Sequence, residues 1–148
     1  MSAGESVSTR LDQIFEEHRQ LHHLLDRTHA ALSSESTARI LVAARLAELR
    51  DQLELHFAHE EVDGYFKDVV RRAPQAAELV EALNAEHPRL FAAIEQLAKF
   101  VDESADEADW RDSASQRFAD LIRQLALHER RENRMVQDAY NNDIGTSN

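Results

Sequence analysis

The chain contains the same helical pattern twice. Residues 49–60 read LRDQLELHFAHE and residues 121–132 read LIRQLALHERRE, and both fit L-x-x-Q-L-x-L-H-x-x-x-E. A second matched pair precedes them, EEHRQLHHLLD around His18 and AEHPRLFAAIE around His87. The corresponding histidines lie 69 and 72 residues apart. The chain therefore reads as two copies of one helix pair, each with a lone His followed by a His-x-x-x-Glu.

Composition favours a single all-α domain. The chain has 148 residues, of which 43% are hydrophobic, with three glycines and two prolines. This length is enough for one domain with a core of its own. Long β-branched runs and Asn-Gly or Asp-Gly hairpin signals are missing from the sequence, which argues against strands.

Charge and cysteine content exclude several classes of function. The formal net charge of −11 argues against nucleic acid or an anionic membrane as partner. The chain has no cysteine, which excludes disulfides, iron–sulfur clusters, thiolate zinc sites and covalent c-type haem. Neither an apolar stretch long enough to cross a membrane nor a signal peptide is visible, so a cytoplasmic protein is expected.

The expected organisation is an antiparallel up-down-up-down four-helix bundle over residues 9–140, with disordered ends at 1–8 and 141–148. Helices are expected at about 9–32, 38–72, 75–101 and 110–140. Gly64 should loosen the second helix, and Pro88 should kink the third because proline cannot bond the carbonyl one turn earlier. The acidic segment 102–109 should connect the last two helices.

Each expected helix carries its histidine on the apolar stripe that faces the core. An α-helix turns about 100° per residue, so Leu49, Leu53, His56 and Glu60 fall within an arc of roughly 60°. The same spacing recurs in the other three helices. It places together Leu121, Leu125, His128 and Glu132; Ile14, His18, Leu21 and Leu25; and Leu83, His87, Leu90 and Ile94. Counting from the turns leaves a mismatch in height of about one turn, roughly 6 Å, between His18 and His56, which loop geometry or helix tilt could absorb.

Two glutamates on core stripes need compensating positive charge, because an unpaired buried carboxylate is very costly. Lysine and arginine do not share these stripes, so a pair of divalent or trivalent cations, with neutral imidazoles as ligands, is the natural compensation. The predicted metal ligands are His18, His56, Glu60, His87, His128 and Glu132. His22 and His59 flank this set, as ligands or as neighbours of ligands. Tyr65, Phe66 and Phe91 are interpreted as packing residues that can also limit access of small ligands.

These motifs resemble the hemerythrin-like (HHE cation-binding) domain over about residues 10–140. The resemblance rests on EEH at 16–18, HFAHEE at 56–61, AEH at 85–87 and HERRE at 128–132. It implies a non-haem, oxo- or hydroxo-bridged centre of two iron ions. In such a centre the four histidines would be terminal ligands, and Glu60 and Glu132 would bridge the irons.

The chain departs from the oxygen-carrying hemerythrins at two positions. Phe91 stands where they have a second histidine on the third helix, and Glu132 ends a motif that they end with aspartate. The four-His, two-Glu set is closer to hemerythrin-like domains of iron-centre repair and iron-sensing proteins. These departures favour reaction with dioxygen, peroxide or nitric oxide over reversible oxygen carriage.

We expect a single-domain bacterial protein that binds or reacts with such small ligands in stress response or iron handling. Catalase-like or oxidase activity is left open, and no catalytic residue is assigned. Three alternatives remain: a non-redox or iron-responsive metal module acting through a protein partner, a metal-free structural bundle, and a b-type haem bundle.

Overall fold

The computed structural model describes residues 3–104 and 108–146, and its described part is entirely helical. The helices are α1 (Ala3–Ser33), α2 (Arg39–Glu61), α3 (Tyr65–Arg72), the 3₁₀ turn η1 (Pro74–Ala76), α4 (Ala77–Glu103) and α5 (Trp110–Thr146). Residues 105–107, within the expected acidic connection, lie outside the described part.

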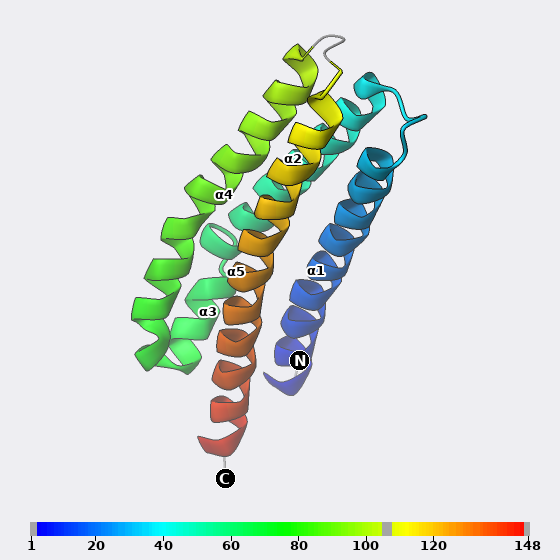
Figure 1. Cartoon of the computed structure of the whole chain (residues 1–148). Coiled ribbons are helices and arrows are strands. Elements are labelled where there is room, and N and C mark those ends of the chain that lie inside the picture. The colour runs from blue at the N-terminus through cyan, green and yellow to red at the C-terminus, as the bar shows by residue number, and fades with distance from the viewer. Residues whose placement is uncertain (1–2, 105–107, 147–148) are drawn as a thin grey trace.

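The four long helices pack as a bundle, which confirms the predicted fold class (Figure 1). The α1–α2 turn lies at the same end of the bundle as the end of α4 and the start of α5. The start of α1 and the end of α5 lie at the opposite end, together with the short helix α3. None of the described helices is long and apolar enough to cross a membrane.

Helix boundaries differ from the expected ones at both ends of the chain. Helix α1 begins at Ala3 instead of Thr9, and α5 continues to Thr146 instead of ending near Tyr140. Residues 3–9 and 140–146 contain no proline, so an established helix can extend by adding one hydrogen bond per residue. Helix α4 is continuous across Pro88.

The expected second helix is divided at Gly64. This residue has a φ of 100°, a left-handed conformation that glycine adopts without a Cβ clash. Helix α2 ends where the amide of Val62 donates to the carbonyl of Ala58 at 2.8 Å, and α3 then starts in a new direction. Asp68 fastens α3 to α5 by accepting from the Tyr140 hydroxyl at 2.7 Å.

The apolar core is divided into two clusters by a layer of buried polar residues. One cluster, toward the α1–α2 turn, contains Leu21, Leu49, Leu53, Ile94 and Leu121. The other, toward α3, contains Ile14, Phe66, Leu83, Met135 and Val136. The stripes of α1, α4 and α5 pass from one cluster to the other through their histidines, and α3 continues the second cluster below the end of α2. The polar layer therefore lies between the two clusters.

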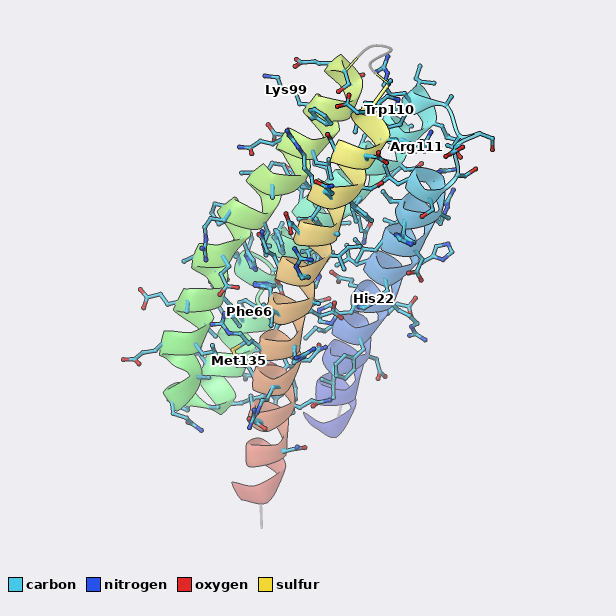
Figure 2. All side chains as sticks on the ribbon, viewed as in Figure 1. His22, Phe66, Lys99, Trp110, Arg111 and Met135 are labelled. Atoms are coloured by element: carbon cyan, nitrogen blue, oxygen red, sulfur yellow. The ribbon has the colours of Figure 1, made fainter. Side chains whose placement is uncertain are left out.

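Two equivalent arginines join the halves of the repeat at the end of the bundle that holds the α1–α2 turn. Arg39, at the start of α2, donates to the carbonyls of Val101 (2.7 Å) and Asp102 (2.8 Å) at the end of α4. Arg111, 72 residues later and labelled in Figure 2, donates to the carbonyls of Ala31 and Leu32 at the end of α1, both at 3.0 Å. Each half therefore satisfies terminal carbonyls of a helix in the other half.

Candidate metal centre

Six buried side chains from four helices meet in the polar layer. They are His18 from α1, His56 and Glu60 from α2, His87 from α4, and His128 and Glu132 from α5, and none is more than 4% exposed. We call these residues the inner set. They are the six predicted from the repeated pattern, and the structure brings all of them together. Their ligand atoms form two groups that could each hold a metal ion.

The first group combines three residues of the first half with Glu132 of the second. Nε2 of His18 lies 2.9 Å from Oε1 of Glu132. Nε2 of His56 lies 3.4 Å from Oε2 of Glu60 and 3.6 Å from Oε1 of Glu132. The rings of His18 and His56 have centroids 4.9 Å apart, so the mismatch counted from the turns does not separate them. Helix α1 extends to Ser33 and α2 begins at Arg39, which shortens the difference counted from the turn.

The second group is the counterpart of the first in the other half of the repeat. Nε2 of His87 lies 3.1 Å from Oε1 of Glu60, and Nε2 of His128 lies 3.5 Å from Oε2 of Glu132. The ring centroids of His87 and His128 are 5.0 Å apart. Each glutamate thus turns one oxygen toward each group.

The inner set fits a pair of metal ions. Both oxygens of Glu60 and the Nε2 atoms of His87 and His128 are buried without a hydrogen-bond partner. Buried polar atoms are normally satisfied, so four unsatisfied atoms directed into one layer indicate a missing partner. Imidazole nitrogens and carboxylate oxygens donate electron pairs to metal ions such as iron, zinc or manganese.

Burial and mutual repulsion shift the pKa values of the acids and imidazoles. Burial raises the pKa of Glu60 well above its usual range, and the negative charge of Glu132 raises it further. Burial also opposes ionisation of Glu132, but contacts with Glu60, His128 and His18 outweigh it and hold its pKa well below the usual range. The two glutamates of the inner set are therefore shifted in opposite directions.

The pKa values of two inner histidines, His56 and His87, are likewise shifted in opposite directions. Burial would lower the pKa of His56, but hydrogen bonds to Glu132 and Glu17 outweigh burial and raise it well above the ordinary value. Burial, reinforced by repulsion from His128, lowers the pKa of His87 to about 4. His87 is consequently a neutral imidazole at neutral pH, the form that binds a metal.

Each inner histidine also has a carboxylate beside its outward nitrogen. Nδ1 of His56 donates to Glu17 at 2.8 Å, and Nδ1 of His128 donates to Glu86 at 3.0 Å. Glu129 lies 3.6 Å from Nδ1 of His18, and Glu61 lies 3.4 Å from Nδ1 of His87. The two hydrogen bonds, from His56 and His128, orient the ring with Nε2 inward and raise its basicity.

Among these four outer carboxylates, Glu17, Glu86 and Glu129 were not singled out in the sequence analysis. Glu17 and Glu86 directly precede the lone histidines in EEH and AEH, which is the signal that could have identified them. Their partners, His56 and His128, lie on the neighbouring helix, so the pairing follows from bundle geometry and not from spacing along one helix.

The two flanking histidines lie outside both groups. The His22 side chain is 60% exposed, and its Nε2 lies 2.8 Å from Glu129. Nδ1 of His59 donates to Glu17 at 2.9 Å. Tyr65 donates to the same carboxylate at 3.0 Å, so Glu17 holds three side chains of the α2–α3 region in place.

A small cavity of about 20 Å³ adjoins the inner set. Its apolar walls are mainly leucines from α1, α2 and α5, namely Leu21, Leu25, Leu49, Leu53 and Leu125. Phe57 and residues of the inner set complete the lining. A cavity of this size has room for about one water-sized molecule. His87 does not line it; the Phe57 ring stacks on that imidazole, with centroids 3.9 Å apart.

The match to a known family agrees with this geometry. No curated protein and no solved structure gives a significant match to the chain. A family model described as the hemerythrin HHE cation binding domain matches residues 9–140, which contain the whole inner set. The chain therefore belongs to the hemerythrin HHE cation-binding domain family.

Proposed function

We propose that the protein binds two iron ions in the inner set and reacts there with dioxygen, peroxide or nitric oxide. In this proposal His18 and His56 hold one ion, and His87 and His128 hold the other. Glu60 and Glu132 bridge the two, since each directs one oxygen toward each group. The iron pair supplies reversible electron transfer and open positions for a small ligand.

The proposal of a small, uncharged ligand is supported by the leucine-walled cavity beside His18 and His56. Its volume of about 20 Å³ has room for a single small molecule, and its apolar surface favours an uncharged one. A larger organic substrate does not fit a cavity of about 20 Å³.

The chain's own residues control the surroundings of the iron pair. The outer carboxylates fix the imidazoles, and leucines of the cavity limit the access of water. Residue 91 on α4 is Phe, where the oxygen-carrying hemerythrins have a second histidine, so each ion would be held by two imidazoles. Two imidazoles for each ion would leave coordination positions open to small ligands, which favours reaction with them over reversible oxygen carriage.

The test is anaerobic loading with Fe(II), followed by exposure to air, peroxide or nitric oxide. We expect two irons per chain by metal analysis and new charge-transfer absorption after each addition. Glu132→Ala should lose one or both irons, because it removes an oxygen from each group. Preferential binding of a spectroscopically silent metal such as zinc, with no absorption change in air, would instead favour a non-redox metal module.

A further inference from the structure

The two halves of the repeat differ at the residue that covers each lone histidine. Phe57 and Glu129 occupy equivalent positions, directly after the second histidine of each half. Phe57 stacks on His87 with ring planes 11° apart. Glu129 instead places a carboxylate 3.6 Å from Nδ1 of His18. One inner histidine is therefore covered by an aromatic ring, and its counterpart by a charged group.

A second pair of equivalent positions differs in the same sense. One turn after the lone histidine, α4 carries Phe91 and α1 carries His22. Phe91 and Phe57 line the same groove beside His87, between α2 and α4. Nε2 of His22, on α1 in Figure 2, lies 2.9 and 2.8 Å from the two carboxylate oxygens of Glu129 on α5. The α2–α4 groove thus combines two phenyl rings with the carboxylates of Glu54 and Glu61. In the α1–α5 seam, two potential metal ligands instead contact each other directly.

Burial increases stepwise along the α1–α5 seam. The exposed fraction of the side chain falls from 60% at His22 to 21% at Glu129 and 1% at Glu132. Glu129 also lines the cavity, and among the described lining residues it is the one polar group outside the inner set. Nitrogen and oxygen donors therefore lead from solvent to the inner set.

We propose that His22 and Glu129 form a port through which metal ions pass between solvent and the inner set. The inference rests on the proposed function only in requiring that the inner set binds metal. A cation entering so buried a site must exchange its water for other ligands, because an uncompensated charge in an apolar interior is very costly. Imidazole and carboxylate groups provide such ligands. His22 and Glu129 contact each other, and Glu129 also lines the cavity beside the inner set, whereas Glu54 and Glu61 of the α2–α4 groove do not line it.

Glu61 is the natural control for this port. It is also an acid beside an inner histidine, 3.4 Å from Nδ1 of His87, and its side chain is 41% exposed. It differs from Glu129 in lying outside the leucine-walled cavity. A general effect of removing negative charge near the metal would appear at Glu61 as well as at Glu129, whereas a port effect would appear only at Glu129.

The experiment measures how fast the metal-free full chain takes up Co(II), followed by absorption in a stopped-flow instrument. We compare the wild type with His22→Phe, Glu129→Gln, the double variant and the control Glu61→Gln. The double variant should take up Co(II) about tenfold more slowly, a barrier increase of about 1.4 kcal/mol. Extraction of Co(II) by a chelator should slow in parallel, while the final number of bound ions stays at the wild-type value.

Four results would overturn the port. Uptake by the double variant at the wild-type rate would show that ions enter elsewhere. Equal slowing in Glu61→Gln would show a general effect of removing negative charge near the inner set. A smaller final number of bound ions in the double variant would make His22 or Glu129 a permanent ligand. Failure of the wild type itself to bind Co(II) at equilibrium would overturn the proposed function too, so the equilibrium and rate measurements separate the two. Circular dichroism checks the fold, which Glu129→Gln should retain because it preserves side-chain size.

Discussion

Replacement of Glu60 by leucine should stabilise the metal-free protein and weaken its response to metal. Glu60 is 1% exposed, both its oxygens lack a hydrogen-bond partner, and its pKa is raised well above the usual range by burial and by Glu132. The residue is therefore unfavourable for folding unless a cation lies beside it. Leucine fits the apolar clusters on either side of the polar layer.

The magnitude follows from the cost of an unsatisfied buried group, about 1–3 kcal/mol. The free energy of unfolding of metal-free Glu60→Leu should rise by that amount, with a thermal midpoint about 2–4 °C higher per kcal/mol in a chain of this size. Free metal at about 100 times its Kd should stabilise the wild type by about 2.7 kcal/mol, and the variant should lose most of that gain. The order of stability should therefore reverse when metal is added.

The assay is urea unfolding monitored by circular dichroism, once with a chelator and once with Co(II). Glu81→Leu, at an exposed position of α4, is the matched control and should change stability by less than about 0.5 kcal/mol in either condition. A metal-free Glu60→Leu protein that is less stable than the wild type, yet gains as much from Co(II), would refute the reasoning.

Two further predictions concern the outer carboxylates and pH. Glu17→Gln and Glu86→Gln should each weaken metal binding about 10–100-fold, because they hold the rings of His56 and His128, and competition with a chelator measures the loss. Unchanged affinity would show that these contacts do not orient the ligands. Metal binding should release protons and strengthen as pH rises, because Glu60 and His56 have raised pKa values and ligands must be deprotonated. Their raised pKa values also mean that the metal-free fold loses stability as pH increases through them, so the gain in thermal midpoint from metal should grow with pH. An indicator dye measures the released protons, and a gain that shrinks at higher pH would contradict the assignment.

The fold and the inner set could be predicted because both depend on a period that is visible in the sequence. Leucine and histidine at helical spacing determine which side faces the core, and the repeat supplies the same stripe four times. His56 and Glu60 occupy one such stripe, and the structure places them with their counterparts from the second half. Their role as metal ligands stays a prediction.

The parts that were missed depend on contacts between neighbouring helices. Glu17 lies beside His56 only because α1 and α2 pack at a particular height, which spacing along α1 does not reveal. Glu129 was missed because the repeat does not hold there, its counterpart being Phe57. The break at Gly64 was partly visible in the sequence. The placement of α3 depends on how Tyr65 and Phe66 pack in the second apolar cluster, which the sequence does not reveal.

The reciprocal arginine contacts show that neither half of the repeat is self-sufficient. Arg39 satisfies carbonyls at the end of α4, and Arg111 does the same for α1. Both groups of ligand atoms likewise contain residues from each half of the repeat, since Glu132 completes the first group and Glu60 the second. A gene encoding a single helix pair could make this architecture only as a symmetric homodimer, with both groups of candidate ligands shared across the twofold axis. Fusion of two such copies would then free each position to diverge separately, as Phe57 and Glu129 have done.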